Sequence, residues 1–220
     1  MTKRENTQNY VAPSQGMHET LQRAFDFYNA ELFESRLPEC IILVHRKRGA
    51  AGYFWAEQWQ DQKGEEKMHE IAMNPELFGR TVDKTLSTLV HEMTHLEQQE
   101  FGTPSKGGYH NKEWAEMMLA VGLTPTTTGV EGGAMTGRKV THMIDAGGLF
   151  DVATQKLKAT GAELSWLAVT PAKKEKKKDL SKVKHTCPEC GMKAWAKLGV
   201  RIMCNDCDEM LDAEDVHGEA

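Results

Sequence analysis

The first part of the chain alternates between helix-like and strand-like hydrophobic patterns. Apolar residues recur every three or four positions over residues 16–37, which predicts an amphipathic helix that ends before Pro38. Three short apolar or alternating runs follow at 40–45, 51–59 and 68–73, and they predict three strands, the last two as a hairpin. We expect the strand at 68–73, directly before the next helix, to form an edge of the sheet.

The central part of the chain predicts two more helices. Residues 82–101 read as a long helix because Gly102 and Pro104 follow them. Residues 111–121 read as a shorter helix with one apolar face. The remaining segments are predicted as a Thr/Gly-rich loop at 122–138, a strand at 139–145 and a last helix at 149–160. Helices and strands in this order favour an α+β fold over an alternating parallel one.

The composition is that of a globular protein. Its 220 residues are 40% apolar and 27% charged, which excludes collagen-like, fully disordered and coiled-coil chains. The longest apolar runs, at 40–44 and 117–121, are far too short for a membrane span, so we expect no membrane partner. Residues 1–10 lack the apolar stretch of a secretory signal, which predicts a cytoplasmic location. The five cysteines are then expected to be reduced thiols or metal ligands.

Charge divides the chain more sharply than its net value of −5 suggests. Residues 173–184 hold seven lysines and two acids, whereas residues 208–220 hold six acids and no lysine or arginine. The lysine-rich stretch is too charged to pack, so it is predicted as a linker. The predicted organisation is a flexible arm at 1–15, a main domain at 16–170, a linker at 171–184, a cysteine module at 185–210 and an acidic tail at 211–220.

The long helix carries a metal-binding motif. Residues 91–95 read His-Glu-Met-Thr-His, and the i, i+4 spacing presents His91 and His95 on one helix face to one zinc ion. Both histidines point away from the leucine stripe, which favours a metal site over histidines that only fill the core. The motif predicts hydrolysis of an amide through a metal-activated water, with Glu92 as the general base.

A catalytic zinc requires a third protein ligand. The metzincin pattern is absent because Gln98 and Phe101 replace its glycine and its third histidine. The candidates further along are His110, Glu113 and Glu116. On the predicted helix His110 lies on the apolar face while the two glutamates turn outward, so His110 is the preferred ligand and the glutamates remain alternatives.

Three other residues have two interpretations each. Tyr109 adjoins His110 and is either an oxyanion donor or a packing residue. His142 alternates with apolar neighbours, which favours an inward-facing structural residue over a ligand. Cys40 lies in an apolar strand and is predicted to be a core residue.

The other four cysteines form a second metal motif. Cys187 and Cys190 make one C-x2-C pair and Cys204 and Cys207 another, a strong pattern for a structural zinc with four thiolates. A segment this short cannot build its own core, so metal binding must contribute to its folding. Redox cysteines or disulfides would need a thioredoxin-like context or an oxidising compartment, and the sequence indicates neither.

Together these motifs resemble the SprT-like zinc metalloprotease family, whose eukaryotic members include the Spartan proteases. The resemblance rests on the motif at 91–95, on His110 within Gly-Tyr-His-Asn-Lys-Glu-Trp and on the four-cysteine ribbon. The strands at 51–54 and 70–74 also look like that family. The resemblance implies a zincin-like domain made of a helix, a three-stranded sheet, an active-site helix and a second helix, followed by a zinc ribbon. It further implies that His91, His95 and His110 bind the catalytic zinc and that Glu92 is the acid/base.

Spartan-type members cleave proteins crosslinked to DNA, so the resemblance also implies protein substrates on single- or double-stranded DNA and a nucleoid-associated location. The sequence adds the basic linker, residues 46–48 (Arg-Lys-Arg) in an expected hairpin turn, and the ribbon residues Lys193, Trp195, Lys197 and Arg201. The alternative is that the lysine-rich segment is a solvated linker and that the other basic residues belong to an ordinary protein surface. A rival function is a non-catalytic DNA- or protein-binding module in which the ribbon binds the partner. The oligomeric state is not predicted.

Overall fold

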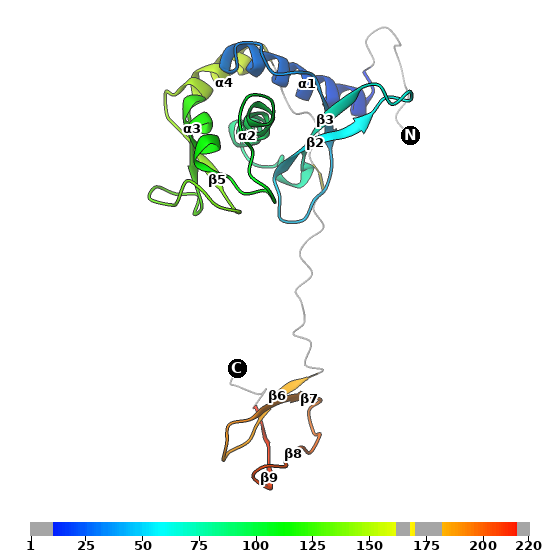
Figure 1. The fold of residues 1–220 in the computed structure, drawn as a ribbon, viewed down its shortest axis with the longest axis vertical. Coiled ribbons are helices and arrows are strands. Elements are labelled where there is room, and N and C mark those ends of the chain that lie inside the picture. Colours follow the sequence, from blue (N-terminus) through cyan, green and yellow to red (C-terminus); the bar gives the residue numbers. More distant parts are fainter. Residues whose placement is uncertain (1–10, 162–167, 170–181, 215–220) are drawn as a thin grey trace. The chain divides into compact units, whose positions relative to one another are not determined.

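The computed structural model describes residues 11–161, 168–169 and 182–214. The chain divides into two compact units, Met1–Thr170 and Pro171–Ala220. The first unit combines helices with two small sheets and the second is built of short strands, which confirms the predicted α+β class (Figure 1). The predicted arm at 1–15, linker at 171–184 and acidic tail at 211–220 lie mostly outside the described residues.

Helix α1 (Pro13–Leu32) is shifted toward the N-terminus relative to the prediction. It begins with Pro13, whose fixed φ and missing N–H suit a first turn. It ends early because the Asn29 side chain accepts from the Leu37 N–H at 3.1 Å and donates to the Leu37 carbonyl at 3.0 Å, which turns the chain away from the helix axis. Its buried face consists of Leu21, Ala24, Phe25 and Tyr28.

The sheet contains β1 (Cys40–Val44), β2 (Gly52–Gln60) and β3 (Lys67–Met73) in the order β1-β3-β2. β3 runs parallel to β1 and antiparallel to β2. The expectation that residues 68–73 form an edge is therefore wrong, since β3 is the middle strand. Its last four residues are all buried, as is typical of a strand covered on both sides. β2 is an edge strand instead.

The basic residues 46–48 do not lie in a hairpin turn, contrary to the prediction. They belong to the connection between β1 and β2, and these two strands are not neighbours in the sheet. The side chain of Asn74 fastens this connection by donating to the carbonyls of Lys47 at 2.9 Å and Ala50 at 2.8 Å. A 3-10 turn (Pro75–Leu77) then leads toward the next helix.

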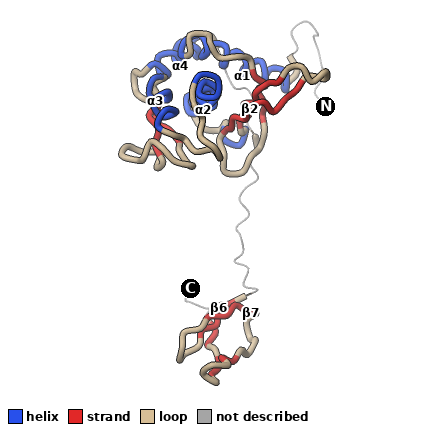
Figure 2. Tube along the Cα trace, viewed as in Figure 1, coloured by secondary structure: helices blue, strands red, loops and turns tan. Residues whose placement is uncertain are grey.

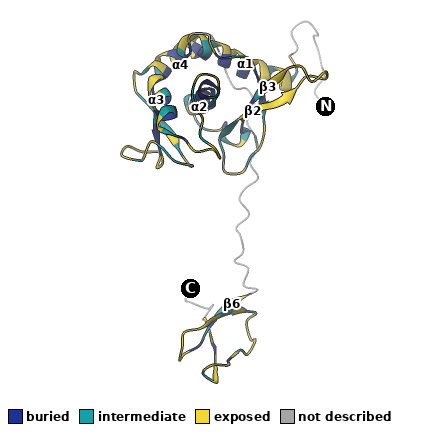
Figure 3. Cartoon of the chain, in the orientation of Figure 1, coloured by how far each residue is buried: buried dark blue, intermediate teal, exposed yellow. Residues whose placement is uncertain are grey.

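Helix α2 (Val82–Phe101) is the centre of the first unit, in contact with α1, the sheet and two later helices (Figure 1). The Thr81 hydroxyl caps its start by accepting from the Lys84 N–H, and Gly102 ends it as predicted. Burial extends around the whole middle of the helix, so it has no solvent-facing side there (Figure 3). A helix placed in this way can hold polar groups in a site that excludes most water.

Four shorter elements complete the first unit: α3 (Lys112–Ala120), β4 (Leu123–Thr126), β5 (Thr141–Ile144) and α4 (Leu149–Ala159). β4 lies where a loop was predicted. It forms a strand because it pairs with β5, which begins eighteen residues after β4 begins. The hydroxyls of Tyr28 and Thr154 lie 2.8 Å apart and join α1 to α4 inside the core. No helix among the described residues is long and apolar enough to cross a membrane.

The second unit is a ribbon of five short strands: β6 (Val183–Thr186), β7 (Lys193–Ala196), β8 (Met203–Cys204), β9 (Glu209–Met210) and β10 (Asp212–Ala213) (Figure 2). β6 pairs with β7 on one side and β10 on the other, so the ribbon extends beyond the predicted 185–210. Among the described residues its buried hydrophobic cluster consists of Cys187, Cys204 and Leu211. This core is too small to fold without another source of stability.

Candidate metal centres

Three histidines from two separate parts of the chain meet beside α2. His91 and His95 lie one turn apart on this helix, and His110 comes from the segment directly before α3. One ring nitrogen from each lies within 4.8 Å of those of the other two. The Nε2 atoms of His95 and His110 are 3.2 Å apart. Two nitrogens bound to one tetrahedral zinc at about 2.0–2.1 Å are separated by about 3.3 Å, so the spacing fits such an ion.

His110 reaches this cluster in a different way from the one predicted. It lies before the helix, not on it, and forms a two-residue bridge with Gly137: the His110 N–H donates to the Gly137 carbonyl at 2.8 Å, and the Gly137 N–H donates to the His110 carbonyl at 3.0 Å. Asn111 follows and caps α3 by accepting from the Trp114 N–H at 3.0 Å. The helical position used in the prediction was therefore wrong, although the residue it favoured lies in the cluster.

The bridge also fixes the proton on the His110 ring. Its Nδ1 lies 3.0 Å from the Gly137 carbonyl oxygen, which can only accept a hydrogen bond. Nδ1 therefore carries the proton, and Nε2 presents its lone pair toward His95. Outer partners of this kind commonly set the tautomer of a metal-binding histidine.

The electrostatics of the cluster favour neutral imidazoles. Burial, followed by the neighbouring histidines, lowers the pKa of His91 well below its ordinary value and that of His95 to about 3. Burial also lowers the pKa of His110, while its hydrogen bond to Gly137 acts in the opposite direction. Neutral imidazole is the form that binds metal, so the donor set is chemically suited to a divalent ion.

Glu92 is part of α2, and its side chain lies against the start of β2. Its side chain is buried, and a β-carbon on Gly52 would be 3.0 Å from its Oε1 atom. Glycine thus lets the edge strand lie directly against the carboxylate. Burial raises the pKa of Glu92 to about 8, and the charge of Lys47 acts to lower it. A carboxyl group with a pKa in this range can both accept and return a proton near neutral pH.

The two glutamates kept as alternative ligands have other partners. Glu113 Oε2 accepts from the Gln98 amide at 2.6 Å and from the Thr103 N–H at 2.7 Å. Glu116 is exposed and pairs with Lys112 at 3.4 Å. Among the described residues the cluster around α2 comprises the three histidines and neither glutamate.

Two aromatic residues near the cluster have different surroundings. Trp114 is fully buried, and its ring centroid lies 4.3 to 5.0 Å from the ring centroids of all three histidines. It forms an apolar wall of the site, whereas the sequence indicated only a core position. Tyr109 is 43% exposed, and its role as an oxyanion donor stays a prediction.

His142 lies closer to the cluster than the sequence suggested. Its Nδ1 atom is 3.2 Å from Nδ1 of His91, and its Nε2 atom is 2.8 Å from the Ser87 hydroxyl. The prediction of an inward-facing residue agrees with its partial burial. Its contact with His91 could not be found from the sequence, because the two residues are 51 positions apart.

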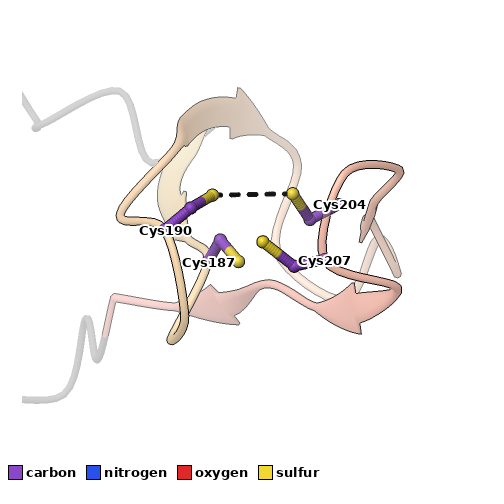
Figure 4. Close-up of side chains that lie close together, drawn as sticks. All are labelled: Cys187, Cys190, Cys204 and Cys207. Atoms are coloured by element: carbon purple, nitrogen blue, oxygen red, sulfur yellow. Dashed lines mark hydrogen bonds between the residues drawn. The ribbon is translucent and has the colours of Figure 1, made fainter.

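The four ribbon cysteines form a second candidate metal site (Figure 4). Their sulfur atoms lie within 4.8 Å of one another, and the Sγ atoms of Cys190 and Cys204 are 3.7 Å apart. Two thiolates on a tetrahedral zinc with bonds of about 2.3 Å are separated by about 3.8 Å. The cluster therefore fits a zinc ribbon.

The two C-x2-C turns share one backbone device. The residue after each pair, Gly191 or Asp208, has a positive φ, 70° and 56°, which turns the chain back around the sulfurs. The Cys190 backbone N–H lowers the pKa of the Cys187 thiol, which favours its metal-binding thiolate form, whereas the neighbouring Cys190 side chain raises the pKa of Cys207 to about 12. Cys40 differs: burial raises its pKa to about 12, as expected for an unreactive core thiol.

Comparison with known proteins gives two matches. The model of the SprT-like family matches residues 21–132. A protein of Salmonella typhimurium described as an uncharacterized protein in the mucB 3' region is 42% identical over 41 residues, which are 19% of this chain and 55% of that protein. The chain thus spans about half the length of this relative. No solved structure matches the chain. The family match includes all three histidines and ends before Gly137, β5 and the ribbon.

Proposed function

This chain belongs to the SprT-like family, a family associated with zinc metallopeptidase-like domains, and from that premise we propose that it is a zinc-dependent endopeptidase. The observation that carries the proposal is the histidine cluster with a buried glutamate beside it. His91, His95 and His110 would hold the catalytic zinc, and Cys187, Cys190, Cys204 and Cys207 would hold a structural zinc. A metal-binding scaffold without activity would not require a carboxyl group at position 92.

The proposed reaction is hydrolysis of a peptide bond. Zinc at the histidine site would polarise the peptide carbonyl and lower the pKa of a water molecule. Glu92 would accept a proton from the attacking water while the water oxygen bonds to the carbonyl carbon. Glu92 then returns the proton to the amide nitrogen as the C–N bond breaks. The three histidines stay neutral, and the Trp114 wall excludes water from one side of the site.

The substrate would lie along β2. Peptides commonly bind proteases by adding a strand to a sheet edge, and β2 has β3 on one side and no strand partner on the other among the described residues. β2 also passes the site: Gly52 adjoins Glu92, and the Phe54 ring stacks near the His95 ring with centroids 6.5 Å apart. A peptide paired with β2 would therefore extend past the proposed general base. This replaces the edge expected at 68–73.

We further propose that the protein substrates are bound or crosslinked to DNA. The support is chemical: Lys47 Nζ lies 4.0 Å from the ring centroid of Tyr53 and 4.7 Å from that of Trp55, beside Arg46 and Arg48. Trp55 is 47% exposed, and in the ribbon Trp195 is 62% exposed. Exposed aromatic rings with basic neighbours suit stacking on unpaired bases and contact with phosphates. A cytoplasmic, nucleoid-associated location follows from this proposal.

The test compares the wild-type chain with Glu92→Gln, which keeps the size of the side chain. Both proteins are assayed for zinc content and for cleavage of a DNA-binding protein, with and without single-stranded DNA. We expect two zinc ions in both, and cleavage by the wild type alone. Equal cleavage by the two proteins would refute Glu92 as the general base. Zinc in the ribbon alone would support the rival binding module, and cleavage unaffected by DNA would remove the DNA part of the proposal.

A further inference from the structure

A chain of hydrogen bonds connects His91 to its own helix through a strand that is distant in sequence. His142 on β5 contacts His91 through Nδ1 at 3.2 Å and the Ser87 hydroxyl through Nε2 at 2.8 Å. The Ser87 hydroxyl in turn lies 3.1 Å from the Lys84 carbonyl, one turn earlier on α2. Both ring nitrogens of His142 are therefore engaged, which leaves neither for a metal ion.

The direction of each hydrogen bond follows from the carbonyl at the end. The Lys84 carbonyl can only accept, so the Ser87 hydroxyl donates its one proton to it. The Ser87 oxygen therefore accepts the hydrogen bond from His142. Nε2 of His142 then carries the proton, and its neutral ring accepts at Nδ1. His91 must therefore donate from its own Nδ1. This leaves the lone pair of His91 on Nε2, its other ring nitrogen.

We propose that His142 is a positioning residue that fixes the tautomer and ring orientation of His91 for metal binding. The inference rests on the proposed zinc site, but its evidence is this hydrogen-bond chain. Gly137 does the same for His110 by accepting from its Nδ1 at 3.0 Å. Residues 137–142 thus provide an outer partner for two of the three histidines, although the family match ends at residue 132.

The pairing of β5 with β4 explains how this segment is held. His142 pairs in register with Pro125, and β4 follows α3 directly. The His91 and His142 rings have centroids 5.3 Å apart. Their contact therefore depends on the β4–β5 pair, which follows α3 in the chain. Residues 137–142 therefore contact the site from a part of the chain that follows α3, whereas β2 precedes α2.

The experiment uses the full chain and a pair of substitutions of nearly equal size. In His142→Asn, the Oδ1 atom stands close to the former Nδ1 and can accept from His91, whereas His142→Leu provides no acceptor. Zinc affinity of the histidine site is measured by competition with a chromophoric chelator. Co²⁺ absorption separates this site from the thiolate site. We expect about a 10- to 100-fold loss of affinity for His142→Leu and recovery of most of it in His142→Asn.

His69→Phe is the matched control. This histidine also engages both ring nitrogens, with the Glu57 N–H at 3.1 Å and Glu100 at 3.0 Å, and neither partner is a histidine of the site. We expect it to lower the unfolding temperature and leave the zinc affinity unchanged. Equal zinc affinity in wild type and His142→Leu would overturn the proposal.

Two outcomes remain to be separated. If His142→Leu does not fold, Ser87→Ala decides, because it removes the acceptor that sets the His142 tautomer; a several-fold weaker zinc site supports the proposal and an unchanged one refutes it. If the wild-type chain binds zinc only through its cysteines, the proposed function fails and this proposal fails with it. If the wild-type chain binds two zinc ions and substitution of His142 leaves the zinc affinity of the histidine site unchanged, only the positioning role is refuted.

Discussion

Gly52 and Glu92 lie in direct contact across the boundary between β2 and α2. A β-carbon on Gly52 would be 3.0 Å from the Glu92 carboxylate and equally close to the Ala72 carbonyl of the neighbouring strand. The edge strand and the proposed general base therefore share a space that admits no side chain. Substitution of this glycine must move either the strand or the carboxylate.

We predict that Gly52→Ala lowers kcat about 10- to 100-fold while zinc content stays at two ions, since small displacements of a catalytic group have effects of that size. Steady-state cleavage of a protein substrate measures it. Gly79→Ala is the matched control, because a β-carbon there meets no atom within 4 Å. Wild-type kcat in Gly52→Ala would show that Glu92 does not depend on this contact.

Substitutions at His110 and Glu113 distinguish the two types of third ligand. Loss of an outer partner weakens metal binding about 10- to 100-fold. His110→Ala removes a proposed ligand itself, so it should weaken zinc binding at the histidine site by more than this. Glu113→Gln should leave zinc affinity unchanged, because the Glu113 carboxylate contacts Gln98 and Thr103. Chelator competition measures both, and the reverse order of effects would assign the ligand to Glu113.

Stability should depend on pH through the same Glu113 carboxylate. The Thr103 N–H and the Gln98 amide lower its pKa below the ordinary value. A group with a lowered folded-state pKa stabilises the fold above its unfolded pKa of about 4.3, and this contribution is lost as the pH falls through the folded value. Thermal unfolding of Glu113→Gln should therefore differ from wild type at pH 7 and converge with it in acid. A constant difference at all pH values would contradict the prediction.

The contact between Tyr28 and Thr154 should stabilise the first unit. Both residues are fully buried and their hydroxyls pair at 2.8 Å. Tyr28→Phe leaves the Thr154 hydroxyl without this partner and should cost about 1–3 kcal/mol of unfolding free energy. Thr154→Val should largely cancel that cost in the double variant. Denaturant unfolding of the four proteins measures the coupling, and strict additivity would show that α4 is not held to α1 by this pair.

The ribbon should depend on its metal for folding. Cys204→Ser removes one of the four sulfurs and part of the small buried cluster. We expect zinc content to fall from two ions to one, and amide protons of the ribbon strands to lose their protection from exchange. Cleavage of a substrate without DNA should continue, because Cys204 belongs to the other compact unit. Retained protection in the ribbon would show that metal is not needed for its fold.

Contact of single-stranded DNA with β2 is tested by separating stacking from charge. Trp55→Ala should weaken binding by about 1–3 kcal/mol, the range for one stacked base. Lys47→Ala should reduce the slope of log affinity against log salt concentration by about the amount that one phosphate contact contributes. Trp59→Ala is a demanding control, because the Trp59 ring is exposed to a similar extent, 42%, while its indole N–H donates to Glu70. Wild-type binding and salt slope in both test variants would exclude this surface.

Much of the first unit could be predicted from local patterns. The helix at Val82–Phe101 matched its prediction, which rested on Gly102 and Pro104 after its last residue, because such stop signals act within a few residues. The three strands were predicted, but their order was not. Residues 68–73 looked like an edge because they precede α2 in sequence, and order in a sheet depends on pairing between distant segments.

The same distinction applies to the site. The spacing of His91 and His95 follows from helix geometry, and the four cysteines follow from two short turns, so the sequence alone specifies both sets of candidate ligands. The Gly137 bridge that brings His110 to the cluster has no local pattern, because a single pair of backbone hydrogen bonds connects segments 27 residues apart.

The sequence by itself determined the α+β class, the helix that carries the metal motif and the four-cysteine ribbon, since each depends on a short period or spacing. Only the tertiary structure decided that β2 is the edge beside Glu92, that Gly137 sets the tautomer of His110, and that His142 contacts His91. These features depend on contacts between segments far apart in the chain. Hydrogen-bond direction and close packing become defined only when those segments meet in the folded protein.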